Sequence, residues 1–210
     1  MKGILFHESL FQLVVDGTKT QTRRLIKSET GYFNVYSRGG IITTIHKTDA
    51  DGWEGGNSVV VNPSYKVGGK CYLKEPYIFD PLFYFGDSSI PCRDSFHKDL
   101  AYIYTYGMDT ERLYSVYGDE IKWKNKLFMP ESAARLFIEI TGVRAERLQD
   151  ISEEDCMKEG IVNEKNYFSN GNGEEYNNPV DAYSDLINSI GDKGTWERNP
   201  FVWVYDFKLV

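Results

Sequence analysis

Alternation of apolar and polar residues is the clearest pattern along this chain, and it predicts strands. The longest alternating run covers residues 136–148, LFIEITGVRAERL, and predicts one long strand. A shorter alternating run predicts a strand at residues 70–76, short strands are also predicted at 4–6 and 101–106, and the β-branched and aromatic residues of 201–210 predict a final strand. Residues 28–64 are rich in Gly, Ser, Thr, Asn and Asp, with weak alternation around 41–45, and predict a long hairpin or insertion.

Helical spacing is confined to short segments. In residues 9–16 the apolar side chains of Leu10, Leu13 and Val14 recur at intervals of three and four, and Gly17 follows as a stop signal. Ser152 predicts the start of a second helix that ends at Gly160. Residues 182–190 predict a third helix, after a polar loop at 163–179.

Many strands with a few short helices predict an α+β fold in which an antiparallel sheet curls into a barrel. The chain has 210 residues, enough for one well-cored domain. No repeat or domain boundary is visible. We therefore expect a single domain over residues 1–210, with insertions at about 28–64, 77–127 and 163–180.

Charge and composition narrow the classes of function. The formal net charge is −7 and the isoelectric point is near 5.1, which argues against a broad electrostatic grip on nucleic acid but leaves room for a cleft that binds one nucleotide. No apolar run approaches the roughly 20 residues that span a bilayer, and no signal peptide is visible, so we expect a cytoplasmic protein without membrane contact. The three Cys and three His residues are scattered, so reduced cysteines and no metal or cofactor are expected.

Residues 17–24, GTKTQTRR, hold three cations and three hydroxyls without an acid, which reverses the sign of the overall charge. Lys19 lies three residues before Thr22, and a lysine with a lowered pKa can remove the proton of a hydroxyl nucleophile. Two alternatives stay open for these residues. They can bind a phosphate or carboxylate, or they can form a solvated basic turn at the end of a helix.

Two further candidate site residues are glutamates at the end of a predicted helix or strand. Glu159 ends a predicted helix directly before Gly160, where the helix dipole favours the protonated form and so proton donation; the alternative is a solvated surface glutamate. Glu75 and Tyr77 follow a predicted strand, where the tyrosine can stack on a base at the rim of a cleft. A surface ion pair and a core tyrosine explain that pair equally well.

Four stretches of the chain resemble the ASCH domain family, a branch of the PUA-like superfamily. They are the opening ILF with GTKTQTRR at 17–24, YKVGGKCYLKEPY at 65–77, the segment at 127–161 and WERNPFVWVYDFKLV at 196–210. In order and spacing they are similar to the longer ASCH proteins of phages and prophages. The resemblance implies a PUA-like mixed β-barrel with short flanking helices and large loop insertions.

The resemblance also implies a site and a reaction. Small bacterial members of the family are N4-acetylcytidine amidohydrolases with a catalytic lysine, threonine and glutamate, which fall on Lys19, Thr22 and Glu159. The arginine that closes their loop motif falls on Arg24. We expect Arg23, Arg24, Glu75 and Tyr77 to bind the substrate.

The implied reaction is attack of the threonine on the acetyl carbonyl, with the glutamate as proton donor. The expected ligand is a nucleoside or a short single-stranded RNA, in a bacterial or phage-infected bacterial cytoplasm. Because this chain is longer than the small enzymes, other functions stay open. They are a non-catalytic RNA- or nucleotide-binding or regulatory module, a ribonuclease, and a structural scaffold in a phage.

Overall fold

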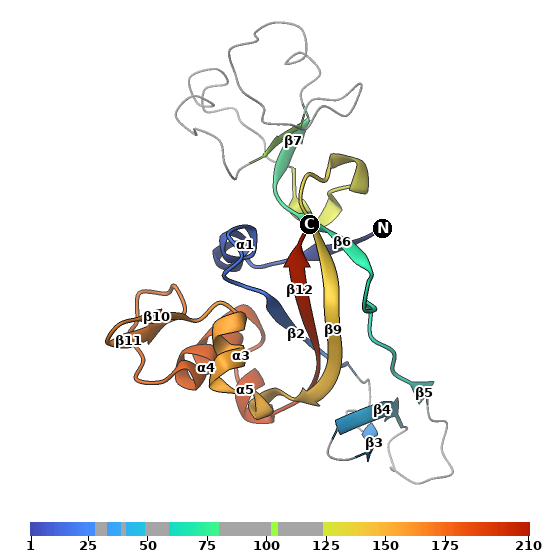
Figure 1. The fold of residues 1–210 in the computed structure, drawn as a ribbon, viewed down its shortest axis with the longest axis vertical. Coiled ribbons are helices and arrows are strands. Elements are labelled where there is room, and N and C mark those ends of the chain that lie inside the picture. The colour runs from blue at the N-terminus through green and yellow to red at the C-terminus, as the bar shows by residue number, and fades with distance from the viewer. Residues whose placement is uncertain (28–32, 39–40, 49–58, 80–101, 105–123) are drawn as a thin grey trace, which may run out of the picture. The chain divides into compact units, whose positions relative to one another are not determined.

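The computed structural model describes residues 1–27, 33–38, 41–48, 59–79, 102–104 and 124–210 (Figure 1). Much of the predicted insertions at 28–64 and 77–127 therefore lies outside the described residues. The chain divides into two compact units that interleave in sequence. The first unit holds residues 1–8, 70–138 and 210, and the second holds 9–69 and 139–209. Neither unit is one continuous segment, so the sequence has no single boundary between them. For this reason the sequence pattern predicted one domain.

The first unit is built on a parallel strand pair. Strand β1 (Lys2–Leu5) lies beside β6 (Lys70–Lys74), in a register that pairs Gly3 with Tyr72. This pair departs from the antiparallel pairing that the strand pattern predicts and agrees with a mixed sheet, because the long connection between the two strands lets the chain return in the same direction. The unit's other elements are antiparallel β7 (Tyr77–Phe79) and β8 (Tyr102–Tyr104) and the 3-10 helices η3 (Lys126–Phe128) and η4 (Glu131–Ala133).

The second unit is built on a sheet in which β12 lies between β9 and β2 (Figure 1). Strand β9 (Phe137–Arg147) confirms the long predicted strand, and its first two residues belong to the first unit. Strand β12 (Phe201–Leu209) confirms the predicted final strand. It pairs antiparallel with β2 (Gln21–Leu25), so that residues from near the two ends of the chain meet in one ladder.

A hairpin extends this sheet, as predicted for the described part of residues 28–64. Strands β3 (Phe33–Arg38) and β4 (Ile41–Lys47) are antiparallel, and β4 also pairs with β5 (Val59–Val60). One bridge, between Ile42 and Ala145, joins β4 to β9. A core cluster that includes Ile26, Ile45, Ala145 and Phe201 lies at this end of the unit.

The helices of the second unit are short. They are α1 (Glu8–Val15, whose first residue belongs to the first unit), α3 (Glu153–Lys158), α4 (Pro179–Ile190) and α5 (Thr195–Arg198). As predicted, the Ser152 side chain accepts a hydrogen bond from the Asp155 amide at the start of α3. Helix α4 starts three residues earlier than predicted because Asn178 caps it and Pro179 occupies its first turn.

The predicted polar loop at 163–179 contains a small hairpin, β10 (Val162–Glu164) and β11 (Tyr167–Ser169). Helices α3 and α4 pack against one face of β12, where Val202 and Val204 join Cys156, Tyr183 and Leu186 in a buried cluster. This packing fixes the end of α3 over the sheet.

The protein is thus a mixed α+β structure with a mostly sheet core and a few short helices. The predicted barrel closure is not found among the strands of the described residues, because β2 is paired on one side alone and leaves the strand order open. No helix in the described ranges has the length and apolar character to cross a membrane.

Candidate functional site

The cationic segment predicted as a loop becomes a strand from Gln21 onward. Gly17, at a φ of +81°, makes the turn after α1, and the backbone around Lys19 is then held from three sides. The Lys19 amide donates to the Leu13 carbonyl at 2.7 Å. The Thr20 amide donates to the Lys158 carbonyl at 2.9 Å, and the Thr20 carbonyl accepts from the Phe207 amide at 2.8 Å. The segment therefore meets α3 and β12 before its own strand begins.

Lys19 and Glu159 form a buried contact at the end of α3. The Lys19 ammonium donates to Glu159 Oε2 at 2.5 Å and to the Glu159 carbonyl at 2.6 Å. Lys19 is 1% exposed and Glu159 is 4% exposed, so the interpretation of Glu159 as a solvated surface glutamate is wrong. The carbonyl is free to accept because Glu159 is the C-cap of the helix.

Gly160 makes this approach possible. Its φ is +103°, which ends the helix directly after Glu159 in a conformation that favours glycine. A Cβ at this position would lie 3.0 Å from Leu13 Cδ1 and 3.8 Å from Lys19 Cβ. The glycine therefore lets α1 and the lysine segment lie against the end of α3.

Arg23 is the centre of a second set of contacts, and its side chain is buried. Its Nη2 donates to Glu146 Oε1 at 2.6 Å and to Asp155 Oδ2 at 3.2 Å. Its Nη1 donates to Glu159 Oε1 at 3.2 Å and also to the Gln21 side chain. One guanidinium is therefore shared by three carboxylates, including the one that binds Lys19.

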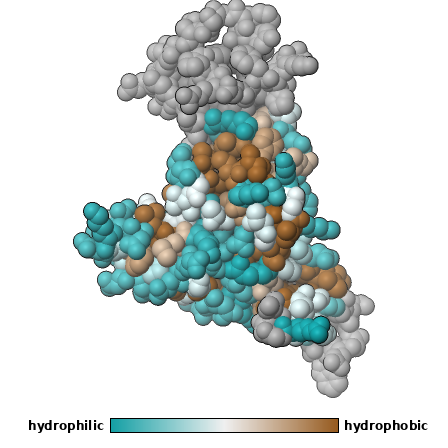
Figure 2. Space-filling view, viewed as in Figure 1, coloured by the Kyte–Doolittle hydropathy of each residue, from teal (hydrophilic) through white to brown (hydrophobic). Residues whose placement is uncertain are grey.

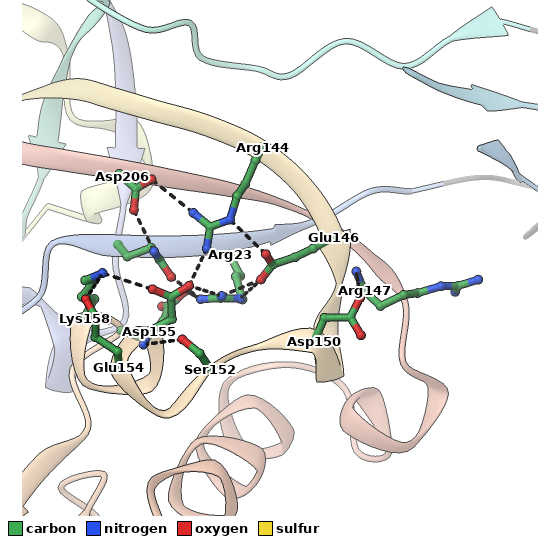
Figure 3. A network of polar contacts seen from close by, with 12 residues as sticks. Arg23, Arg144, Glu146, Arg147, Asp150, Ser152, Glu154, Asp155, Lys158 and Asp206 are labelled. Carbon is green, nitrogen blue, oxygen red and sulfur yellow. Dashed lines mark hydrogen bonds and ion pairs between the residues drawn. The ribbon is translucent and has the colours of Figure 1, made fainter. Parts of the chain in front are cut away.

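A shell of further ion pairs surrounds Arg23 (Figure 3). Arg144 donates to Glu146 Oε2 at 3.0 Å, to Asp206 Oδ2 at 3.2 Å and to the Asp155 carboxylate. Gln21 also donates to Asp206, at 2.7 Å. These carboxylate oxygens already receive arginine and amide donors, so the cluster is not an open set of metal ligands.

The sequence interpretation missed this network. The signal for it is the pair Arg144 and Glu146, which are two residues apart and so lie on one face of a strand. A charged face on the longest predicted strand of the chain needs partners of opposite sign. Arg23 and Asp155 supply them from β2 and α3.

Burial sets the protonation of the lysine. It lowers the pKa of Lys19, and the charges of Arg24 and Arg23 lower it further, while Glu159 opposes the change. Burial acts to lower the pKa of Arg23 as well, but Glu159 and its other partners outweigh that effect and raise it. Within this cluster the lysine is therefore the cation that is drawn towards its neutral form.

Thr22 and Arg24 lie on the other face of β2 from Arg23, because side chains alternate along a strand. Thr22 pairs with Tyr205 of β12, and Arg24 pairs with Trp203. No hydrogen bond joins Lys19 to Thr22, whose hydroxyl has no hydrogen-bond partner among the described residues. The charge of Arg24 nevertheless acts on Lys19, which places the lysine within electrostatic reach of this face.

Tyr183 of α4 lies beside the same cluster. The Arg23 guanidinium carbon lies 5.9 Å from the centre of its ring. Its hydroxyl is fully buried and has no hydrogen-bond partner among the described residues. Burial raises the pKa of Tyr183, and the charge of Glu159 raises it further, so the hydroxyl stays protonated.

Glu75 and Tyr77 belong to the first unit and are described with it. Glu75 is fully buried and accepts two hydrogen bonds from Arg135, at 2.8 and 2.7 Å. Burial raises the pKa of Glu75 even though Arg135 opposes the change. Tyr77 lies in a core cluster with Tyr72 and Met129. Tyr77 is therefore a core tyrosine, and the ion pair of Glu75 with Arg135 is buried rather than on the surface.

Comparisons with models of known protein families, with curated proteins and with solved structures gave no match.

Proposed function

We propose that this chain is an ASCH protein with a PUA-like core, and that it hydrolyses the amide bond of an N-acylated cytidine such as N4-acetylcytidine. The observation that carries the proposal is the buried contact of Lys19 with Glu159. Two of the three residues implied by the family resemblance meet there, although they lie 140 residues apart in the chain. The PUA-like assignment rests on the sequence resemblance together with the mixed, mostly sheet core.

The Lys19–Glu159 pair can hold and move a proton. An ammonium beside a carboxylate and an amine beside a carboxylic acid differ in the position of one proton, and burial lowers the pKa of Lys19 and so eases release of its proton. In the second arrangement the lysine is a base and the glutamate an acid. This is the pair of functions that amide hydrolysis at neutral pH requires.

In the proposed reaction the Lys19 amine takes the hydroxyl proton of Thr22, and the Thr22 oxygen forms a bond to the acetyl carbonyl carbon. The oxyanion is held by Arg24 or by backbone N–H groups. The bond from carbon to N4 then breaks, and Glu159 donates its proton to that nitrogen. Water releases acetate from the acyl-threonine and restores the pair. For the first step, the Lys19 amine, with its proton already on Glu159, must turn from Glu159 towards Thr22.

Arg23 has a positioning function in this proposal. Its guanidinium is occupied by three carboxylates, so we assign it to holding Glu159 rather than to binding substrate. By holding Oε1 of Glu159, it leaves Oε2 for the lysine. Arg24, on the Thr22 face, is the arginine that we assign to the substrate.

The test is release of cytidine from N4-acetylcytidine by the purified protein. We expect turnover by the wild type and its loss in Lys19→Ala, Thr22→Ala and Glu159→Gln. Thr18→Ala is the matched control, because Thr18 is an exposed hydroxyl of the same segment. Absence of turnover in the wild type would overturn the proposal, and full turnover in all three variants would overturn the site.

A second candidate function is a nucleoside- or RNA-binding module without hydrolysis. It is favoured by one observation, that Lys19 is bound by Glu159 and has no hydrogen bond to Thr22. Calorimetric binding of N4-acetylcytidine without release of cytidine would support this function over the first. Binding that is unchanged in Arg24→Ala would count against this site in either function.

A further inference from the structure

The first unit presents an exposed aromatic side chain, Phe128, beside a second apolar residue, Leu127. Phe128 is 76% exposed, more than any other large apolar residue that the structure describes, and Leu127 is 52% exposed. The visible face in Figure 2 is largely hydrophilic, with separate apolar areas. Met129, the next residue, is buried, so the chain turns inward directly after these two side chains.

The turn that carries Phe128 is fixed by its own hydrogen bonds. The Asn125 side chain accepts from the Leu127 amide at 2.8 Å and so caps η3. The Met129 carbonyl accepts from the Tyr72 hydroxyl at 3.1 Å, which ties the end of the turn to β6. The aromatic ring is therefore held out on an ordered support, which lowers the entropy cost of binding to it.

Two lysines lie at this turn without a carboxylate partner among the described residues. Lys74 donates to the Leu127 carbonyl at 2.6 Å, and Lys126 donates to the Phe6 carbonyl at 3.4 Å. Two described acids of the same unit are already bound, Glu75 by Arg135 and Glu131 by the amino terminus of the chain. Among the described residues, the charged groups shown to contact this turn are therefore the ammonium groups of Lys74 and Lys126.

We propose that this surface, formed by Phe128, Leu127, Lys74 and Lys126, binds single-stranded RNA. A base stacks on the Phe128 ring while the two ammonium groups bind the flanking phosphates. A folded protein partner is a poorer fit, because two apolar side chains are far less than the roughly 1,200 Å² of a specific protein interface. The choice of RNA over DNA rests on the proposed function, whose substrate is a ribonucleoside.

The test is fluorescence anisotropy of a fluorescein-labelled oligocytidylate titrated with the full chain. We expect Phe128→Ala to weaken binding by about 5- to 100-fold, because one stacked base is lost. Phe128→Trp keeps a stacking surface and is expected to bind at least as tightly as the wild type. Lys126→Ala is expected to reduce the slope of log affinity against log salt by about 0.7, the value for one phosphate contact on a single strand.

Lys66→Ala and Val67→Ala are the matched controls, because Lys66 and Val67 form an exposed lysine and apolar pair in the second unit. We expect neither to change the affinity. The proposal is overturned if the wild type does not bind the oligonucleotide, or if Phe128→Ala binds it like the wild type. It is also overturned if light scattering shows that Phe128→Ala dissociates a dimer.

The readout separates this proposal from the proposed function. Phe128→Ala is expected to leave turnover of free N4-acetylcytidine unchanged, since a free nucleoside has no neighbouring phosphates or bases. Loss of oligonucleotide binding with intact turnover therefore supports the surface. Absence of turnover with intact binding counts against the hydrolase alone.

Discussion

Lys19 and Glu159 share a contact from which solvent is excluded, with the Lys19 ammonium group on both the carboxylate and the main-chain carbonyl of Glu159. Three constraints bring them together. The Lys19 amide is bound by the end of α1, Gly160 ends α3, and Arg23 holds the other carboxylate oxygen of Glu159. The contact is therefore part of the packing of the second unit, and substitutions in any of these supports are expected to change it.

A double-mutant cycle on Lys19 and Glu159 measures how strongly the two side chains stabilise each other. Lys19→Met leaves Glu159 with one cation fewer, and Glu159→Leu leaves a buried lysine without its carboxylate, so each is expected to destabilise the fold. The double variant removes both charges and is expected to be about 1–3 kcal/mol more stable than the sum of the single effects predicts. Urea unfolding of the four proteins measures this difference. Additive effects would show that the pair is not coupled.

Removal of the central guanidinium is expected to be costly. Arg23→Met leaves three carboxylates gathered around a missing cation and is expected to lower the free energy of unfolding by about 3–5 kcal/mol. Arg23→Lys restores the charge but not the forked donors, so it should recover part of the loss. Arg38→Met, at an exposed position, is the control and should stay within about 0.5 kcal/mol. A loss no larger than the control's would contradict the network.

Acid stability depends on Asp155. Burial acts to raise the pKa of Asp155, but the charges of Arg144 and Arg23 outweigh it and hold the pKa below the ordinary value of 3.8. The stabilisation is complete above pH 3.8 and is lost as the pH falls through the lowered pKa. Asp155→Asn should therefore flatten the dependence of unfolding free energy on pH in this acid range. Asp192→Asn, an exposed aspartate, should leave the wild-type curve unchanged.

Gly160 and Gly171 both have a positive φ, so alanine substitutions at the two positions distinguish the cost of backbone strain from the cost of a close side-chain contact. Gly171, at a φ of +83°, has nothing within 4 Å of an added Cβ, so Gly171→Ala is expected to cost about 1–2 kcal/mol from backbone strain alone. Gly160→Ala adds the close approach to Leu13 and is expected to cost more. It should also slow turnover of N4-acetylcytidine, because it displaces Glu159, whereas Gly171→Ala should not. Equal thermal stability of the two variants would contradict the tight approach.

Removal of the buried Tyr183 hydroxyl is expected to stabilise the protein, unlike the substitutions above. Because it has no hydrogen-bond partner among the described residues, Tyr183→Phe is expected to raise the free energy of unfolding by up to about 1–3 kcal/mol. The ring contacts with Arg23 and Trp196 are kept in this variant. Chemical denaturation measures the change. A loss of stability would show that the hydroxyl has a bound partner, such as an ordered water.

The sequence predicted those helices and strands whose local residue pattern and capping residues favour the same structure that packing in the fold imposes. Strand β9 alternates over much of its length, and β12 is rich in β-branched and aromatic residues. Ser152 and Gly160 mark both ends of the α3 segment. It did not predict that residues 21–25 form a strand, because QTRRL has neither alternation nor an apolar face. Pairing with β12 imposes the strand, and this information lies about 180 residues further along the chain.

The same limit applies to the candidate site. The sequence spacing connects Lys19 with Thr22, but the structure binds Lys19 to Glu159, which the resemblance alone had connected with it. Arg23 was expected to bind the substrate because it belongs to the cationic segment 17–24, and an arginine binds phosphate or carboxylate oxygens. Its burial depends on Glu146, Asp155 and Glu159, which come from two other elements. The spacing of Arg144 and Glu146 marks a charged face on β9, but it does not identify the residues that this face meets.

The ladder between β2 and β12 has a consequence for biosynthesis. As the chain leaves the ribosome, Lys19 and Arg23 emerge well before Glu159 and the strand that pairs with Thr22. Until then the two cations remain hydrated, and contacts of such long range form slowly. The lysine can therefore exchange water for its carboxylate partner only after the segment that carries Glu159 has been made.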